Sequence, residues 1–291
     1  MPEYEGTIIR PPSEAESLIL QYTIGCSHNE CIFCPAYKQK LFRIRSIEEM
    51  EKDILDCAPA FNDTRRVFLA DGDALSAPQQ DILTLFALLR RYFSRLRRIG
   101  MYANTRSILD KSVDELSRLR EQGLGILYLG VESGDDTLLA WMQKGVTAEE
   151  TMEASRRVKK AGIKLSVTVL LGIGGSTGSI QHARATGKLL TEIEPDYVGA
   201  LTTMVVRGTP LYLLQESGNF TMPDSFAILN ELAEMIEHTE MRGLFFANHA
   251  SNYMPLQVRM PLQREETITM IREFVRKGDP SFLKPERLRR L

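Results

Sequence analysis

The stretch Gly125-Ile126-Leu127-Tyr128-Leu129-Gly130-Val131 is apolar along almost its whole length. A run of this kind suits a strand that is covered on both faces, as strands of parallel sheets are. Similar apolar runs predict five further strands, at residues 18–23, 67–70, 99–103, 164–171 and 197–205. The chain therefore contains enough strands for one large sheet.

Amphipathic helical stretches separate these strands, at residues 79–93, 113–121, 148–160 and 180–193. The first helix begins at Ser46, because Ser46 and Glu49 have the spacing of a capping box, and its apolar stripe ends at Cys57. Strands that alternate with helices pair in parallel through right-handed crossovers. We predict an α/β fold, a partial (β/α)6 barrel that resembles a TIM barrel.

The alternation changes after Gly208. A helical stretch at residues 224–238, a strand-like run at 244–247 and a helix at 265–277 follow. We predict an N-terminal segment at residues 1–14, a β/α core at 15–208 and a C-terminal α/β extension at 209–291 that caps one end of the core.

Composition narrows the class of protein. The chain has 291 residues, of which 43% are hydrophobic and 25% charged, and its formal net charge is −2. The apolar fraction argues against disorder, and the charge balance argues against a general polyanion binder. No signal peptide and no apolar run of membrane-spanning length is visible. We expect a cytoplasmic protein with no membrane partner.

Three of the four cysteines, Cys26, Cys31 and Cys34, lie within nine residues and directly follow the first predicted strand. In barrel enzymes, the carboxyl ends of the strands carry the chemistry. Three thiolates on one loop can hold three corners of a cubane iron–sulfur cluster, which leaves the fourth iron open. Zinc, with His28 as a further ligand, is the alternative. Cys57 lies on an apolar helical face and is predicted to be a core residue.

Polar residues and glycines also follow other predicted strands. The second strand ends in Asp71-Gly72-Asp73, and the fourth ends in Glu132-Ser133-Gly134 with Lys144-Gly145 downstream. Asn104 and Arg106 lie just beyond the third strand, and a glycine cluster that begins at Gly172 follows the fifth. Arg207, after the sixth strand, is either an anion contact or part of a surface salt bridge. Each of these turns also has a purely structural interpretation.

Together these motifs resemble the radical S-adenosylmethionine (radical SAM) superfamily. The similarity covers roughly residues 15–210, and the segment Gly130-Val131-Glu132-Ser133-Gly134 is typical of the branch that contains anaerobic coproporphyrinogen oxidase, the Elongator catalytic subunit and the methylthiotransferases. The family's usual cysteine spacing is Cys-x3-Cys-x2-Cys, whereas this chain has Cys-x4-Cys-x2-Cys. Because flexible loops absorb one residue at little cost, we expect the ligand set to be retained.

The resemblance implies two cofactors, a [4Fe-4S] cluster on the three cysteines and S-adenosylmethionine chelated at the open iron. It implies that the Asp71–Asp73 turn meets the methionine amino group, that Glu132 or its neighbours reach the ribose, and that the glycine-rich strand end at Gly172 lies beside the adenine. The complete set of predicted cofactor-binding residues is Phe33, Asp71, Gly72, Asp73, Asn104, Glu132, Ser133, Gly172 and Arg207.

The activity implied by the resemblance is reductive cleavage of S-adenosylmethionine. The products would be methionine and a 5′-deoxyadenosyl radical, which takes a hydrogen atom from an unidentified small or medium-sized substrate. An electron donor such as flavodoxin or ferredoxin would reduce the oxygen-sensitive cluster. In the extension, His249 and Tyr253 lie on a polar loop after an apolar run and are candidates for donating a proton or hydrogen atom. Capping of nearby helices is the alternative role of that loop.

Two other functions compete with this one. The first is a zinc- or iron–sulfur-containing structural or electron-transfer protein without S-adenosylmethionine chemistry. The second is a tRNA-modifying radical SAM enzyme, for which arginines cluster at residues 90–98 and 287–290. Such charge runs are usually solvated faces, so we favour a small substrate over nucleic acid.

Overall fold

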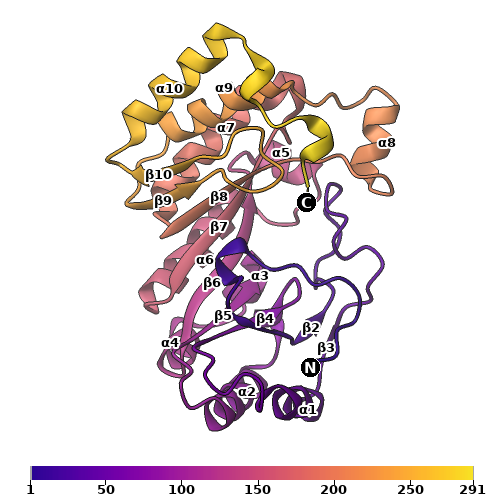
Figure 1. Ribbon diagram of the computed structural model, residues 1–291, viewed down its shortest axis with the longest axis vertical. Coiled ribbons are helices and arrows are strands. Elements are labelled where there is room, and N and C mark those ends of the chain that lie inside the picture. Colours follow the sequence, from indigo (N-terminus) through magenta and orange to yellow (C-terminus); the bar gives the residue numbers. More distant parts are fainter. Residues whose placement is uncertain (1, 291) are drawn as a thin grey trace. The chain divides into compact units, whose positions relative to one another are not determined.

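The computed structural model describes residues 2–290, and these residues divide into two compact units (Figure 1). The first unit comprises residues 1–29, 36–129 and 153–165, and the second comprises 30–35, 130–152 and 166–291, within the described range. The functional boundary that the sequence predicts at residue 208 stays a prediction.

The first unit is built on parallel strands in the order β1 (Leu18–Gln21), β4 (Arg66–Ala70), β5 (Arg98–Ala103) and β6 (Leu124–Glu132, of which residues 124–129 belong here). In register, Leu20 pairs with Leu69, Leu69 with Met101 and Met101 with Leu127, and all four side chains are fully buried. This apolar row across the sheet is why the strands read as almost continuous hydrophobic runs.

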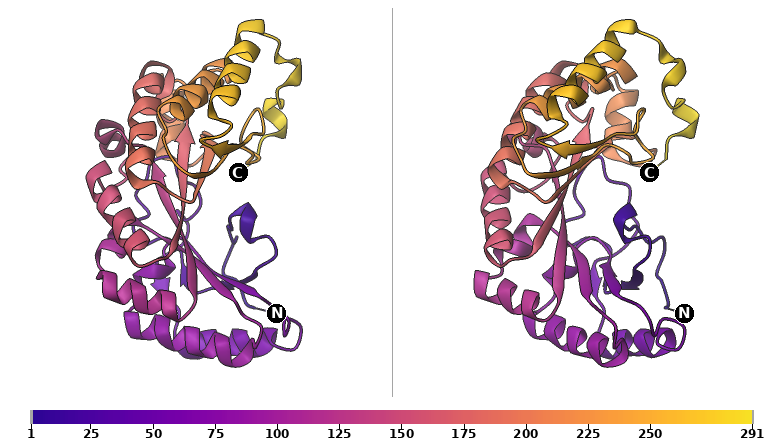
Figure 2. Two further views of the ribbon diagram at one scale, coloured as in Figure 1. Left: turned by 90° about the vertical axis from the view of Figure 1, so that its left-hand side faces the viewer. Right: turned by 60° about the vertical axis from the view of Figure 1, so that its left-hand side comes forward.

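Helices α1 (Ile47–Cys57) and α2 (Gln79–Tyr92) lie side by side (Figure 2). The predicted capping box at Ser46 and Glu49 is present, and Cys57 is fully buried, as predicted. Helices α3 (Thr105–Leu109) and α4 (Val113–Glu121) follow β5, and most of α6 (Ala148–Lys160) also belongs to this unit. The hairpin of β2 (Thr23–Ile24) and β3 (Arg43–Ile44), and the 3-10 turns η1 (Pro12–Glu14) and η2 (Ala74–Ser76), complete it.

In the second unit, β7 (Lys164–Leu171), β8 (Tyr197–Thr202), β9 (Gly243–Phe246) and β10 (Gln257–Met260) are hydrogen-bonded in this order. The first three are parallel and β10 is antiparallel. Val167, Val198, Phe245 and Val258 form a buried row in register. The C-terminal extension thus continues this sheet with β9 and β10.

Helices α7 (Gly175–Ile193), α9 (Ser225–Glu237) and α10 (Arg264–Lys277) pack in sequence, with α9 in the middle (Figures 1 and 2). The shorter helices are α5 (Asp136–Trp141) and α8 (Pro210–Glu216), and two 3-10 turns, η3 (Pro280–Phe282) and η4 (Glu286–Leu288), lie near the C-terminus. The predicted α/β class with a parallel sheet is confirmed. No helix among residues 2–290 combines the length and hydropathy that crossing a bilayer requires.

One buried carboxylate fastens the N-terminal turn of the first unit. Glu14 is fully buried, and its Oε1 accepts hydrogen bonds from Arg98 (2.6 Å) and the Tyr128 hydroxyl (2.5 Å), while its Oε2 accepts one from Ser17. Burial of a charge is costly unless it is paired, so this set of donors compensates for the desolvation of the carboxylate. Glu16 also pairs with an arginine, Arg66, but its side chain is 84% exposed.

These two glutamates form a matched pair for mutation. We expect Glu14→Gln to lower the free energy of unfolding by about 3 kcal/mol, because it leaves Arg98 without its buried partner. Glu16→Gln removes the same charge at the surface and should cost less than about 1 kcal/mol. Urea unfolding followed by circular dichroism measures both. Equal effects would show that the Glu14 contacts contribute no more than a surface ion pair.

Candidate functional site

The cysteine loop follows strand β2, a two-residue hairpin strand, whereas the sequence predicted one continuous strand over residues 18–23 directly before the loop. Cys26, Cys31 and Cys34 are each partly exposed, and none of the chain's four cysteines is in a disulfide. The backbone N–H of Cys34 donates to the carbonyl of Cys31 (3.3 Å), which closes a turn between the last two thiols. Partly exposed thiols on a tight loop are accessible to a metal, whereas the fully buried Cys57 is not.

The first unit fixes Cys26 through a close approach to Gly72. A Cβ atom added at Gly72 would lie 2.8 Å from the Cβ of Cys26 and 2.8 Å from the ring of Tyr37. In addition, the N–H of Gly72 donates to the carbonyl of Gly25 (3.0 Å). Only glycine allows this contact, so Gly72, two residues after the end of β4, sets the path of the cysteine loop.

Asp71, one residue earlier, is fully buried, and an ion pair with Lys40 compensates its negative charge. Its Oδ2 accepts hydrogen bonds from the side chain of Gln21 (2.9 Å), the N–H of Gly25 (3.1 Å) and Lys40 Nζ (2.7 Å). Its Oδ1 is buried and has no hydrogen-bond partner among the described residues. Asp71 therefore holds the start of the cysteine loop and keeps one acceptor oxygen unused.

Asp73 is also fully buried, but all of its acceptor capacity is used. Its Oδ1 accepts from the N–H of Asn104 (3.2 Å) and Ser107 Oγ (2.7 Å), and its Oδ2 accepts from Ser27 Oγ (2.5 Å) and Asn104 Nδ2 (2.8 Å). Burial raises the pKa of Asp73, and the hydrogen bonds from Ser27 and Ser107 oppose that shift. The carboxylate connects the cysteine loop to the end of β5.

Asn104 has a second role at this position. It is the N-cap of α3 and forms a capping box with Ser107. Asn104 was predicted from the sequence, whereas Ser27 and Ser107 were not. The Asn104-x-x-Ser107 spacing was the available signal for Ser107, whereas nothing local indicated that Ser27 bonds to a residue 46 positions away.

In the second unit, Ile32 anchors the part of the loop that carries Cys31 and Cys34. Ile32 is buried with Leu139, Met142 and Leu211 among others, and Phe33 packs against the same cluster. The N–H of Ile32 donates to the carbonyl of Met142 (3.1 Å), and its carbonyl accepts from the N–H of Leu211 (3.1 Å). An apolar side chain between two thiols thus fixes both of them to this unit.

Glu132 ends strand β6 in a left-handed conformation, with φ at 65°. Its carboxylate lies over Gly130, where an added Cβ would come 2.2 Å from Oε1, and it pairs with Lys144 Nζ (3.0 Å). Both side chains are largely buried, at 11% and 13% exposed. The predicted Glu132 and the Lys144-Gly145 motif are therefore brought together, and positive φ at a non-glycine residue is typical of functional sites.

Ser133 and Gly172 are held by residues that the sequence analysis did not assign to the site. His182 is fully buried, and its Nδ1 lies 2.8 Å from Ser133 Oγ. Its Nε2 lies 2.6 Å from the carbonyl of Leu170, so Nε2 carries the proton and Nδ1 accepts from the serine. The buried carboxylate of Glu231 accepts the N–H of Gly172 (2.7 Å) and bonds to Ser179.

Gly172 adopts a positive φ of 79°, and an added Cβ would lie 2.6 Å from Ile228 and 2.8 Å from Met222. The turn that follows, residues 173–177, lines a pocket of about 340 Å³ together with Trp141 and Phe220, whose rings are stacked at 5.8 Å. The contacts of Gly172 itself are therefore packing contacts with the α9 region, and its predicted place beside the adenine stays a prediction.

The predicted residues of the extension lie in one loop. His249 Nδ1 accepts from the N–H of Ser251 (3.2 Å), and burial lowers the pKa of His249. The Tyr253 hydroxyl donates to Glu286 (2.7 Å) and accepts from Arg289 (2.7 Å). Burial raises the pKa of Tyr253 to about 12. Their catalytic roles stay predictions.

Asn252 and Arg207 lie in the loops that follow β9 and β8. Asn252, between His249 and Tyr253, bonds to the backbone of Thr202 and Ala200, so it fastens the loop to strand β8. Arg207 is exposed and forms no ion pair with any residue that the structure describes. A surface salt bridge, the alternative that its sequence left open, is thus not formed here.

Comparison with known proteins gives the family. The family model described as "Radical SAM superfamily" matches residues 20–184, which is more than half of the chain. The chain belongs to the radical SAM superfamily and is an enzyme of that superfamily. The cofactors of the superfamily are a [4Fe-4S] cluster and S-adenosylmethionine.

Three similar proteins represent the predicted branch. The tRNA-2-methylthio-N(6)-dimethylallyladenosine synthase of Dehalococcoides mccartyi is 28% identical over 202 residues, which are 67% of this chain and 47% of that protein. Coproporphyrinogen III oxidase of Escherichia coli has a TM-score of 0.61 at 17% identity, over 86% of this chain and 58% of that one. Elp3 of the archaeon Methanocaldococcus infernus has a TM-score of 0.51 at 15% identity, over 79% and 58%. The chain spans about half the length of the curated relative.

The residues of this chain fit the two cofactors. Three thiols outside any disulfide, two of them closed into a turn, are soft ligands of the kind that iron–sulfur clusters require. The unpartnered buried oxygen of Asp71 matches a cationic or N–H donor, whereas the four donors on Asp73 leave it no capacity. The two predicted acids thus differ in what they have available.

The contact between Gly72 and Cys26 gives a direct test of loop position. We expect Gly72→Ala to displace the Cys26 backbone and to reduce the iron content after anaerobic reconstitution to below roughly half of the wild-type value, because a close-packed site cannot absorb a methyl group. Gly178→Ala is the control, since an added Cβ meets nothing within 4 Å there. Wild-type iron content in Gly72→Ala would contradict the positioning role of Gly72.

The buried pair His182 and Glu231 makes opposite contributions to the pH dependence of stability. Burial lowers the pKa of His182 from 6.5 to about 4 and raises the pKa of Glu231 from 4.5 to about 7. From pH 4.5 to 6.5, the unfolded chain holds the histidine proton and the folded protein holds the glutamate proton. The histidine contribution to stability therefore rises with pH in this window while the glutamate contribution falls.

Glu231→Gln should leave only the histidine contribution. We expect the free energy of unfolding of this variant, relative to the wild type, to rise between pH 4.5 and 6.5 by up to about 1.4 kcal/mol per pH unit. Glu240→Gln removes an exposed glutamate and should track the wild type. Urea unfolding at several pH values gives the comparison. A Glu231→Gln profile parallel to that of the wild type would rule out a protonated Glu231.

Proposed function

We propose that Cys26, Cys31 and Cys34 ligate the [4Fe-4S] cluster of this radical SAM enzyme. The observation that carries the proposal is the turn between Cys31 and Cys34 on a loop that Gly72 and Ile32 hold at its two ends. Three ligands leave one iron open, which is the coordination that S-adenosylmethionine requires. Cys57 takes no part, because it is buried in the core of the first unit.

We also propose roles toward S-adenosylmethionine. Asp71 Oδ1 and the backbone at Gly72 receive the methionine ammonium, while Asp73 and Asn104 shape that turn through their hydrogen bonds. Glu132 and Ser133 serve the ribose, with Phe33, Gly172 and Arg207 as further cofactor contacts. The ion pair with Lys144 and the hydrogen bond with His182 orient Glu132 and Ser133 before any ligand binds.

When bound, the reduced cluster and S-adenosylmethionine supply a strong acceptor for a substrate hydrogen atom. The protein's residues orient the substrate and exclude water and oxygen, and we propose His249 and Tyr253 as the donors that complete the reaction. The chain's net charge of −2 supports a small or medium-sized substrate. A flavodoxin or ferredoxin in the cytoplasm is the proposed reductant, since reduced thiols persist in that compartment.

A tRNA substrate is the second candidate within the family. It is favoured by the curated relative from Dehalococcoides mccartyi, whose name gives a tRNA nucleoside as the substrate of that protein. The aligned region covers only 47% of that relative, so the remainder of its length has no counterpart in the match. We therefore retain the small substrate as the primary proposal.

Cysteine variants test the ligand assignment. After anaerobic reconstitution, Cys26→Ala, Cys31→Ala and Cys34→Ala should each lose the reduced-cluster signal in electron paramagnetic resonance, because a cubane with two protein ligands is not retained. Cys57→Ala should keep that signal. In the wild type, the signal should shift when S-adenosylmethionine is added.

Metal analysis separates this proposal from the zinc alternative. Zinc at one ion per chain with no acid-labile sulfide would overturn the cluster assignment. Loss of the signal in Cys57→Ala, with the protein still folded by circular dichroism, would show that the ligand set has been assigned incorrectly.

A further inference from the structure

Four arginines stand at the amino ends of two neighbouring strands in the first unit. Arg66 and Arg98 are the first residues of β4 and β5, and Arg65 and Arg97 come immediately before them. In the parallel register Arg66 is opposite Arg98, and the N–H of Arg97 donates to the carbonyl of Arg65 (2.9 Å). Successive residues of extended chain point to opposite faces, so each face receives one arginine from each strand.

The two faces differ in how this charge is compensated. Arg66 and Arg98 pair with Glu16 (2.5 Å) and Glu14 (2.6 Å). On the other face, the guanidinium groups of Arg65 and Arg97 form no ion pair or hydrogen bond with any residue that the structure describes. Both side chains are exposed, so water solvates their charges and no acidic group of the described residues competes for them. Two neighbouring like charges repel each other, and an anion placed between them would relieve this repulsion.

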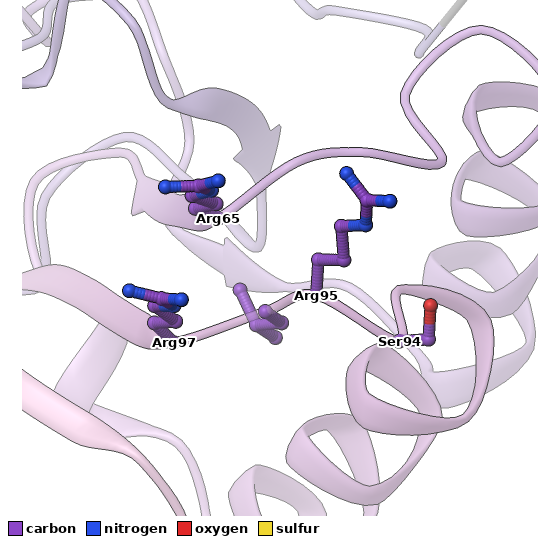
Figure 3. Close-up of a pocket in the computed structure, with 5 residues that line it drawn as sticks. Arg65, Ser94, Arg95 and Arg97 are labelled. Atoms are coloured by element: carbon purple, nitrogen blue, oxygen red, sulfur yellow. The ribbon is translucent and has the colours of Figure 1, made fainter.

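These side chains line a pocket of about 430 Å³ together with Ser94, Arg95 and Leu96. Figure 3 shows Arg65 and Arg97 turned in the same direction, whereas the Arg95 side chain extends another way from the segment between them. Arg95 pairs with Asp63 (3.0 Å), but both side chains are mostly exposed, so this ion pair is weak and can exchange. Ser94, on the same lining, offers a hydroxyl group that can donate a hydrogen bond.

We propose that Arg65, Arg97 and Arg95 form a binding site for a phosphate group. Guanidinium forks match the oxygens of phosphate in pairs, and an oxyanion between Arg65 and Arg97 would replace their mutual repulsion with two charge-assisted contacts. The group belongs to a small phosphorylated compound or to the backbone of an RNA strand. Both sources present the same chemistry.

The site is distinct from the proposed cofactor site. Asp71, Gly72 and Asp73 follow the carboxyl end of β4, whereas Arg65 precedes its amino end, so the whole strand separates them. An acidic electron donor bound at the arginines would lie at the wrong end of this strand to reduce a cluster at the cysteine loop. The pocket is therefore assigned to a phosphate ligand rather than to the reductant.

Titration of the reconstituted full-length protein tests the site with two probes, inorganic pyrophosphate and an unstructured single-stranded RNA. We expect Arg65→Gln and Arg97→Gln each to weaken binding of the probe by about tenfold, as loss of a charge-assisted contact does. Arg66→Gln is the matched control, since it removes the same charge from the same strand end on the opposite face. Its affinity should stay within about twofold of wild type.

The two probes distinguish the sources. Pyrophosphate binding that depends on Arg65 indicates a small phosphorylated ligand. Binding of RNA alone indicates a backbone phosphate, and in that case the slope of log affinity against log salt should fall by about one in Arg65→Gln. Either result supports the site. The proposal is overturned if neither probe binds the wild type at low salt, or if Arg66→Gln weakens binding as much as Arg65→Gln.

A stability measurement gives a second readout that does not need a known ligand. Without phosphate, Arg65→Gln should melt at a temperature equal to or above that of the wild type, because a repulsion has been removed. Added pyrophosphate should raise the melting temperature of the wild type and of Arg66→Gln but not of Arg65→Gln. An equal rise in all three proteins would indicate general charge screening and would contradict the site.

Discussion

The four-donor hydrogen-bond set on Asp73 is the constraint on which the arrangement of the first unit's site depends. A carboxylate with no access to water must be satisfied internally, and here the donors come from the cysteine loop, from the end of β5 and from the first turn of α3. None of those segments can move without breaking a charge-assisted bond. The acid thereby converts the adjacent strand ends into one rigid framework for Cys26.

Buried acids in this protein are compensated in three different ways. Asp73 receives only neutral donors, Glu14 receives an arginine and two hydroxyls, and Glu231 receives a backbone N–H and a serine. The physical consequences differ accordingly. Burial with few neutral donors raises the pKa of Glu231 to about 7, and a carboxyl group in that state can be neutral near physiological pH. The N–H of Gly172 is thus bound by a side chain, Glu231, whose charge depends on pH.

The strands and most helices were predictable because their signals are local. Apolar runs marked all six core strands, and capping chemistry marked the start of α1. Helix α7 begins at Gly175, whereas the sequence pattern indicated a start at 180. The pattern missed the first turn because that turn consists of glycine, serine and threonine, which are weaker helix formers than alanine or leucine. The hairpin β2–β3 has only two residues in each strand, too few for alternation to be visible. Tertiary pairing decided both cases.

The candidate site was predictable to a smaller extent. Motifs marked the cysteines, Glu132 and the Asp71–Asp73 turn, because each follows a strand whose position was evident. Ser27 and Glu231 carried no such mark, since their partners lie 46 and 59 positions away. Hydrogen bonds over such separations depend on the register of the sheet and the packing of helices, and a single sequence contains neither.

The arginines at the strand starts are a second case in which the sequence alone does not distinguish residues that the structure treats differently. In the sequence, the dipeptides Arg65-Arg66 and Arg97-Arg98 are indistinguishable, and a run of this kind is usually a solvated face. Alternation along extended chain separates each dipeptide onto two faces, and the positions of Glu14 and Glu16 neutralise one face only. A surface charge can bind a ligand specifically when neighbouring charges of the same sign are paired within the protein and this one is not. The difference between two adjacent, chemically identical residues therefore indicates a binding site more strongly than the total charge does.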